Sequence, residues 1–383
     1  MKKDVTIVVP MVLAILLLLV LAFNTLMMSQ LSDSLKSKIA STTEAKRPAK
    51  LLLIGIDVEG CTGCYDINAV ISKLEALNVN ITTEDIFDWK SPQVSELIQK
   101  YNIQKVPTLL VFGEINKSSA ITGFWSGYGV TVQDALVLTK QSPLYYDVAT
   151  GKEIGRVNAI YLNSTKCPDC ADQSGWIDTL RQNDIILGDI KYVDADTPEG
   201  FDLADKYNIS FAPTFIFSSD LGAYDIIKQN WAGVGSVEED GSYVLRSNAV
   251  PYYDLKTSKI RGLVTLAYIT DKSCTTCYNV SIHKTIFGNP LGFAMKIVNE
   301  SSHDISDAAG KALIDKYKIT NVPTVIMKGD PAAYARLTAV WPQVGTVESD
   351  GSYVFRNVGL LGVVYMNLSS GKIVNASIPV ATQ

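Results

Sequence analysis

The sequence has 383 residues, too many for one ordinary hydrophobic core, and its length predicts about two to four domains. Hydrophobic residues make up 47% of the chain and charged residues 19%, a composition typical of packed globular domains. The net charge is −5 and no Lys/Arg cluster is present, so we expect no nucleic acid partner. With only two histidines, His283 and His303, we expect no His-based metal site and no repeated Cys-His catalytic pair. We also expect no cofactor.

An uncharged apolar segment covers residues 5–28, directly after Lys2 and Lys3. As a helix it is long enough to cross the roughly 30 Å hydrocarbon core of a membrane. A cleaved secretory signal is the alternative, but the segment exceeds the usual apolar length of about 7 to 15 residues and lacks a clear cleavage site. We therefore expect a single-pass anchor at 5–28, with residues 1–4 cytoplasmic and the remainder extracytoplasmic. The polar residues 29–48 are expected to form a flexible stalk.

Cysteine usage and glycosylation sequons favour the same compartment. All six cysteines lie in close pairs, an arrangement suited to dithiol/disulfide chemistry where conditions are oxidising. Asn-x-Ser/Thr sequons exceed the number that composition predicts, which favours a glycosylated external face, unless Asn, Ser and Thr merely share loops. The candidate glycosylation sites are Asn80, Asn116, Asn163, Asn208, Asn279, Asn299, Asn367 and Asn375.

The cysteine pairs belong to an internal repeat of three copies, which predicts three similar domains. Each pair follows an apolar segment typical of a strand, and Ile67, Val70, Ile71 and Leu74 predict an amphipathic helix after the first pair. A second strand and a helix that starts with Ser-Pro or Thr-Pro come next. The pattern Tyr-x-Ile-x-x-x-Pro-Thr then introduces another strand, and a tryptophan follows that we expect in a core or between domains. The pairs are Cys61/Cys64, Cys167/Cys170 and Cys274/Cys277.

This order of elements and motifs resembles the thioredoxin superfamily, including its disulfide isomerases and oxidoreductases, over most of the chain. We therefore expect an α/β protein with three tandem thioredoxin-like domains, each a central mixed sheet flanked by helices. Their expected ranges are 49–142, 143–250 and 251–383, the last with a closing hairpin. The resemblance implies a cis proline beside each cysteine pair and substrate binding by the loop that holds it. The loop residues are Val106, Pro107, Ala212, Pro213, Val322 and Pro323.

Two thiols three residues apart at the start of a helix can close a disulfide, and the helix dipole favours the thiolate of the first. The resemblance implies that the first cysteine of each pair attacks a substrate disulfide and that the second, namely Cys64, Cys170 or Cys277, resolves the mixed disulfide. Lys166 and Lys272 are expected to favour the thiolate in the second and third copies. Glu59 is expected to oppose it in the first copy.

The sequence also departs from the thioredoxin pattern at positions that bear on function. Gly55, Tyr161 and Tyr268 stand where thioredoxins proper place a buried aspartate, so no proton acceptor for the resolving thiol is evident. We therefore expect a membrane-tethered, extracytoplasmic thiol-disulfide oxidoreductase acting on protein thiols and disulfides, with its direction of electron flow left open. A membrane-embedded thiol electron carrier is the candidate redox partner. The main alternative is a cell-surface scaffold whose pairs are structural disulfides, while a metal site is disfavoured because two cysteines do not complete one.

Overall fold

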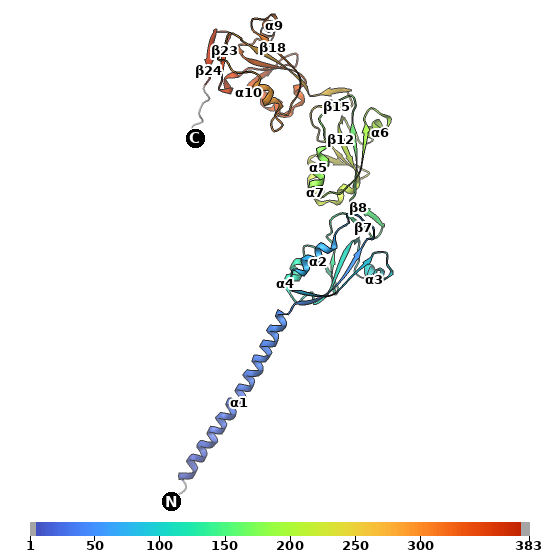
Figure 1. Cartoon of the computed structure of the whole chain (residues 1–383), viewed down its shortest axis with the longest axis vertical. Helices are drawn as coiled ribbons and strands as arrows, with labels where there is room; N and C mark the ends of the chain where they lie inside the picture. Colours follow the sequence, from blue (N-terminus) through green and yellow to red (C-terminus); the bar gives the residue numbers. More distant parts are fainter. Residues whose placement is uncertain (1–4, 377–383) are drawn as a thin grey trace. The chain divides into compact units, whose positions relative to one another are not determined.

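The computed structural model describes residues 5–376, and contacts within it divide the chain into two compact units between Ile154 and Gly155. The first unit begins with the helix α1 (Val5–Lys46), labelled in Figure 1. Residues Met11–Lys46 are apolar enough over part of their length to cross a membrane, a test that a signal sequence also passes. Their side chains are almost all exposed.

The prediction of a flexible stalk at 29–48 is wrong, because α1 continues without a break to Lys46. Ser and Thr usually disfavour helices because their hydroxyls compete for backbone groups. Here the hydroxyls of Ser41 and Thr42 donate to the carbonyl of Lys38 at 2.9 and 2.7 Å, and Thr43 donates to Ile39 at 2.8 Å. These side chains therefore bond one turn back along a helix that remains intact.

The first copy of the repeat contains a five-stranded sheet in the order β2-β1-β4-β6-β5. Strand β1 is parallel to β2 and antiparallel to β4, as a mixed sheet requires. Two strands that follow the sheet, β7 and β8, pair instead with β3 in a separate three-stranded ribbon. The elements are β1 (Ala49–Asp57), α2 (Ile67–Glu75), β2 (Val79–Asp88), α3 (Pro92–Lys100), β3 (Lys105–Val106), β4 (Thr108–Gly113), α4 (Ser119–Trp125), β5 (Gly129–Val132), β6 (Ala135–Leu138), β7 (Tyr145–Asp147) and β8 (Lys152–Ile154).

The second copy repeats this arrangement in the second unit, with sheet order β10-β9-β12-β14-β13 and the ribbon β11-β15-β16. Two short 3-10 helices flank its third α-helix. The elements are β9 (Val157–Asn163), α5 (Gly175–Gln182), β10 (Leu187–Asp194), α6 (Pro198–Lys206), β11 (Phe211–Ala212), β12 (Thr214–Phe217), η1 (Ser219–Ala223), α7 (Asp225–Asn230), η2 (Trp231–Gly233), β13 (Gly235–Val237), β14 (Tyr243–Leu245), β15 (Tyr252–Asp254) and β16 (Lys259–Arg261).

The third copy completes the second unit, with sheet order β18-β17-β20-β22-β21 and the ribbon β19-β23-β24. The elements are β17 (Leu263–Thr270), α8 (Ile282–Gly288), β18 (Lys296–Asp304), α9 (Ala308–Tyr317), β19 (Asn321–Val322), β20 (Thr324–Gly329), η3 (Pro331–Ala333), α10 (Ala335–Val344), β21 (Gly345–Val347), β22 (Tyr353–Phe355), η4 (Val358–Leu361), β23 (Val364–Asn367) and β24 (Lys372–Asn375).

Hydrophobic residues fill a core on each face of each five-stranded sheet. The stripe predicted after the first cysteine pair forms α2, and its Ile67, Val70, Ile71 and Leu74 are buried against the sheet. A second cluster on the other face contains residues of α3 and the segment before β4. The repeated tryptophans lie in these cores rather than on the surface, as their size predicts; they are Trp125, Trp231 and Trp341.

The ribbons move the expected domain boundaries toward the C-terminus. Each copy ends in a hairpin that pairs with a strand of the same copy, so that the hairpin β7–β8 belongs with β3 and β15–β16 belongs with β11. The first copy therefore extends to Ile154 rather than to residue 142, and the second to Arg261 rather than to residue 250. Backbone hydrogen bonding explains the difference, because β7 and β15 satisfy N–H and C=O groups on β3 and β11, which lie in the same copy.

Candidate redox sites at the three cysteine pairs

Each cysteine pair is closed as a disulfide, with Cα atoms 5.3 to 5.7 Å apart. Each lies just beyond the carboxyl end of an inner strand of its five-stranded sheet, namely β1, β9 or β17. Across residues 5–376, no group of three or more His, Cys, Asp or Glu side chains lies close enough to hold a metal ion. The chemistry open to each cysteine pair is reversible exchange between dithiol and disulfide.

The expectation that each pair lies at the start of a helix is wrong. The pairs lie in turns, and α2, α5 and α8 begin only at Ile67, Gly175 and Ile282. The N–H of the residue after each pair is bonded outside the helix, to a carbonyl directly before the closing hairpin or, in the third copy, at its first residue. These bonds run from Tyr65 to Leu144 at 2.8 Å, from Ala171 to Pro251 at 2.7 Å and from Tyr278 to Val364 at 3.0 Å. Since the dipole acts within about the first helical turn, it gives these sulfurs little help.

An aspartate at the end of the second strand fixes the backbone before each pair. It accepts a hydrogen bond from the N–H two residues before the first cysteine. The contacts are Glu59 to Asp88 at 2.9 Å, Thr165 to Asp194 at 3.3 Å and Lys272 to Asp304 at 2.7 Å. The Glu59 N–H holds the pKa of Asp88 below its usual range, and the Ser306 hydroxyl does the same for the pKa of Asp304. Sequence reasoning missed these residues, although an aspartate ends the second strand in every copy.

The loops expected to bind substrate lie beside the pairs but are covered. As the resemblance implies, the peptide bonds before Pro107, Pro213 and Pro323 are cis. All six loop residues are buried, and the three that precede the prolines, Val106, Ala212 and Val322, are 0% exposed. Each proline carbonyl accepts a hydrogen bond from a side chain of its own copy. The donors are Gln141 at 3.0 Å, Gln173 at 2.7 Å and Tyr278 at 3.0 Å.

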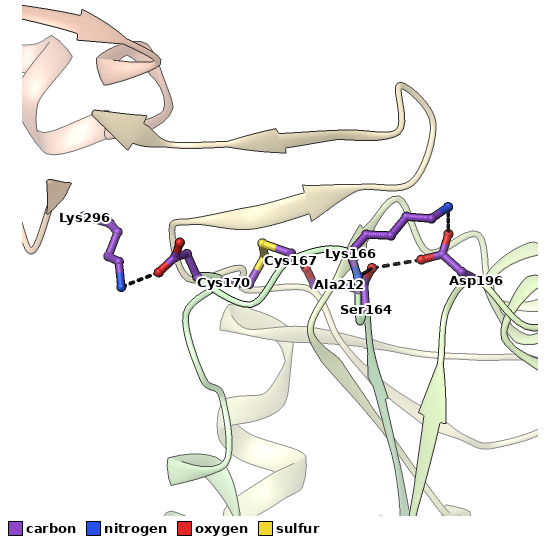
Figure 2. The surroundings of a disulfide bond; sticks show 8 residues. Ser164, Lys166, Cys167, Cys170, Asp196, Ala212 and Lys296 are labelled. Atoms are coloured by element: carbon purple, nitrogen blue, oxygen red, sulfur yellow. Dashed lines mark hydrogen bonds and ion pairs between the residues drawn. A yellow bond between two sulfur atoms is a disulfide. The ribbon is translucent and has the colours of Figure 1, made fainter. Parts of the chain in front are cut away.

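The two cysteine residues of the second pair, and likewise those of the third, differ in exposure. Cys167 is 6% exposed and Cys274 is 7% exposed, whereas Cys170 and Cys277 are half-buried. The second sulfur is close to the proline loop in the second copy, where Cys170 Sγ lies 3.9 Å from the carbonyl oxygen of Ala212 (Figure 2). In these two copies the more accessible residue is thus the one to which the resemblance assigns the resolving role.

The first pair has no such difference between its two sulfurs. Cys61 and Cys64 are joined as a disulfide with Cα atoms 5.7 Å apart, and both residues are half-buried. The expectation that Cys64 lies within the first turn of a helix is wrong, because α2 begins only at Ile67. The N–H of Tyr65, directly after Cys64, is bonded to Leu144, so it is not available for the bond to the Cys61 carbonyl that a helix through the pair would require. Exposure therefore does not distinguish an attacking from a resolving cysteine in this copy.

Charged groups near the pairs also differ from the expected set. Figure 2 shows the Lys166 side chain reaching away from the disulfide, and its Nζ lies 2.6 Å from Asp196 Oδ1. This ion pair balances the charge that was expected to favour the thiolate of Cys167. In the first copy the carboxylate in contact with sulfur is not Glu59, because Glu153 Oε2 of strand β8 lies 4.0 Å from Cys61 Sγ.

The third copy holds the only histidine that is almost completely buried, among the residues that the structure describes. His283 is 2% exposed, and burial lowers its pKa to about 4. Its Nε2 lies 3.1 Å from the hydroxyl of Tyr278, which itself donates to the carbonyl of Pro323. Through these two hydrogen bonds, His283 of helix α8 is linked to Tyr278, the residue after Cys277, and to the cis proline Pro323.

The sequons also differ in access. Six of the candidate asparagines are exposed, and they are Asn80, Asn116, Asn208, Asn279, Asn299 and Asn375. Asn163 and Asn367 are half-buried. The amide of Asn367 donates to Asn321 Oδ1 at 2.9 Å, so that its nitrogen is already engaged within the fold.

No protein-family model matches this sequence, and no curated protein has significant similarity to it. Among solved structures, the zinc-bound form of human ERp44 is 13% identical, with 76% of this chain and 83% of that chain covered and a TM-score of 0.13. A crystal structure of ERdj5 is 10% identical, with 82% of this chain and 43% of that chain covered and a TM-score of 0.14. At such TM-scores the likeness carries no argument, so the assignment depends on strand order, cysteine position and cis proline. By these features the chain contains three tandem copies of a thioredoxin-like fold.

Proposed function

We propose that this chain is a thiol-disulfide oxidoreductase that exchanges disulfides with proteins through its six cysteines. One observation carries the proposal. In all three copies a closed Cys-x-x-Cys pair follows an inner strand and belongs to the same copy as a buried cis proline. A local disulfide closes so few residues that it adds little stability through loop-closure entropy. Its retention three times at the same place is better explained by reactivity.

In the proposed reaction, a thiolate of the reduced pair attacks a disulfide of the partner protein. The partner's leaving sulfur departs as a thiolate, which takes up a proton, and a mixed disulfide joins the two chains. The second cysteine of the pair then attacks the mixed disulfide. The pair is oxidised to its own disulfide by two electrons, and the partner is reduced by the same two electrons. The reverse sequence oxidises a partner dithiol.

Exposure supports different roles for the two cysteines of the second pair and for those of the third. Because Cys167 and Cys274 are buried, we propose that Cys170 and Cys277 form the mixed disulfides in the second and third copies. This assignment reverses the order of attack that the resemblance implies. The proposed substrate-binding residues remain those of the cis-proline loops.

In the first copy both cysteines are half-buried, so charge decides the proposed order. The Glu153 carboxylate beside Cys61 disfavours a thiolate there. Cys64 has no carboxylate contact of this kind among the described residues, and it is half-buried like Cys61. We therefore propose Cys64 as the attacking residue of the first pair as well, rather than as the resolving one.

The proposed location is the extracytoplasmic face of a membrane, with α1 as an uncleaved anchor and the N-terminus cytoplasmic. The 42 residues of α1 extend about 63 Å, roughly twice the thickness of a hydrocarbon core. An apolar half therefore suffices to span the bilayer, and the polar half would project from it. A membrane-embedded thiol electron carrier fits this location as redox partner. N-linked glycans are proposed at the six exposed sequons.

One observation favours the alternative of a surface scaffold with structural disulfides. Burial of Cys167 and Cys274 protects one sulfur of each of these bonds from solvent. The two functions differ in how easily the bonds are reduced, because structural disulfides have potentials below about −300 mV.

A redox titration of the full-length chain in detergent separates the two functions. Each disulfide is followed by differential alkylation and mass spectrometry. Midpoints above about −300 mV support exchange, and midpoints below it at all three pairs support the scaffold.

Trapping with paired variants tests the cysteine roles. We expect Cys167→Ala, which leaves Cys170, to retain mixed disulfides with protein partners, and Cys170→Ala to retain far fewer. The same contrast is expected between Cys274→Ala and Cys277→Ala, and a smaller one between the corresponding variants of Cys61 and Cys64. Equal trapping by both members of the second and third pairs contradicts the assigned roles, and no trapped protein from any copy contradicts the enzyme.

A further inference from the structure

The closing hairpin of each copy occupies the backbone edge beside the cis proline. Its first strand is antiparallel to the two residues before the proline, in the pairs β3–β7, β11–β15 and β19–β23. The residue directly before the proline is in register with a hairpin residue each time. The partners are Val106 and Tyr146, Ala212 and Tyr253, and Val322 and Met366.

The same hairpin is attached to the cysteine pair. The carbonyl of Pro251, directly before β15, accepts a hydrogen bond from the N–H that follows Cys170 at 2.7 Å. Figure 2 shows the hairpin of the second copy running past the Cys167–Cys170 disulfide. In the first copy the hairpin reaches the sulfur itself, since Glu153 Oε2 lies 4.0 Å from Cys61 Sγ.

This placement has a consequence for binding. An extended peptide that joins a protein by strand pairing needs free N–H and C=O groups on an edge. Beside the cysteine pairs those edges are already paired with the chain's own hairpins. The loop residues Val106, Ala212 and Val322 are fully buried, in core clusters against which hairpin residues also pack. A protein partner therefore meets a covered edge, although the half-buried Cys170 and Cys277 still contact solvent.

We propose that each closing hairpin is a lid on its own redox site, and that an extended segment of a protein partner must displace it to reach the disulfide. This inference rests on the proposed function, since it describes how the same sites are regulated. Small thiols do not need strand pairing and reach the accessible sulfur while the lid is closed. The closed lid therefore slows reduction of the disulfide by small thiols only weakly. It slows disulfide exchange with folded proteins strongly.

The hairpins are short enough to detach. Each pairs with two residues of the proline loop and has two further backbone hydrogen bonds to its copy, in the second copy from Leu255 to Ser210 at 2.9 Å and from Ala171 to Pro251 at 2.7 Å. An isolated hairpin is marginally stable in water, so these few contacts hold it in place. Side-chain anchoring differs between copies, because Tyr253 is buried, at 4% exposed, whereas Tyr146 and Met366 are half-buried. The lid of the second copy is therefore the most firmly closed, and its disulfide is the best place for a test.

The experiment compares Tyr253→Gly with Lys259→Gly in the full-length oxidised chain in detergent. Tyr253→Gly removes the buried anchor. Lys259→Gly introduces a glycine at an exposed position of the outer strand β16 and serves as the control. Reduction of Cys167–Cys170 is timed with dithiothreitol and, separately, with reduced thioredoxin as a protein dithiol. Differential alkylation with mass spectrometry reports each disulfide, so the other two pairs serve as internal references.

We expect Tyr253→Gly to accelerate reduction of Cys167–Cys170 by the protein dithiol at least about tenfold, because a buried aromatic anchor is lost. Reduction by dithiothreitol should change less than about threefold, and Lys259→Gly should leave both rates near those of the native chain. Hydrogen exchange must show β15 deprotected in Tyr253→Gly while β9 and β12 stay protected. An unchanged protein-dithiol rate with β15 detached overturns the lid and leaves the proposed function standing.

Two further outcomes are decisive. If the protein dithiol reduces none of the three pairs in any variant while dithiothreitol does, the proposed function fails and the lid fails with it. If Tyr253→Gly unfolds β9 and β12, the native chain is tested in urea below its unfolding transition. There the protein-dithiol rate at Cys167–Cys170 must rise in parallel with hydrogen exchange of β15, and a rate that does not follow β15 opening overturns the lid.

Discussion

Acidification is expected to destabilise the third copy more than the other two, because of one buried histidine. His283 lies between the aromatic rings of Phe287 and Phe355, with ring centroids 5.6 and 4.8 Å away. The Tyr278 hydroxyl donates its proton to Pro323, so its oxygen accepts from the Nε2–H of His283. A second proton on the ring would place a positive charge in this apolar setting, which is costly.

The magnitude follows from the change in pKa. Burial lowers the pKa of His283 from its ordinary value of 6.5 to about 4. Between pH 6.5 and pH 4 the His283 ring is protonated in the unfolded chain but neutral in the folded chain. The stability of the folded state is therefore fully present above pH 6.5 and is lost as pH falls toward 4. At 1.36 kcal/mol per pH unit the loss amounts to about 3 kcal/mol. That is a large part of the stability of an ordinary domain.

Urea titrations at pH 7 and pH 4.5 test this expectation on the full-length chain. A hydrogen-exchange pulse at one fixed pH reports unfolding through peptides of β17 and β20, with β1 and β4 as references. We expect the third copy to lose stability at pH 4.5 by more than the first, and His283→Gln to remove most of the difference. His303→Gln is the matched control, since this residue is only half-buried. An equal pH effect in native chain and His283→Gln would refute the reasoning.

Two further substitutions test contacts around the cysteine pairs. One oxygen of Asp304 accepts from the Lys272 N–H and the other from the N–H and hydroxyl of Ser306, so Asp304→Asn sets an amide NH2 against one of these donors and should destabilise the turn before the third pair by about 2 kcal/mol. Hydrogen exchange of the Lys272 amide measures the effect, and unchanged protection contradicts it. Glu153→Gln removes the carboxylate beside Cys61 Sγ and should make reduced Cys61 alkylate about threefold faster at pH 7. Glu59→Gln, which changes the carboxylate named from sequence, should have the smaller effect.

The architecture could be predicted from sequence because its signals are local and repeated. Apolar strands, an amphipathic stripe such as that of α2, and a Pro-Thr at a regular distance recur in each copy, and the strand order agrees with the fold they indicate. Periodicity within a segment is decided by neighbours a few residues away, which a single sequence displays. The cysteine pairs and the Pro-Thr prolines could be located for the same reason, and the cis state of those prolines was implied by the resemblance.

Only the tertiary structure decided how the sites are covered. Nothing local in Tyr253 indicates that β15 pairs with Ala212, far earlier in the chain, because strand pairing depends on which edge is free in the folded chain. Burial of Cys167 and the carboxylate contact of Cys61 follow from such distant segments. The turn around each pair has the same origin, since an N–H bonded to the hairpin segment is not available for the helical bond to the carbonyl of the first cysteine. The sequence alone thus determined what the sites contain, and long-range pairing determined what can reach them.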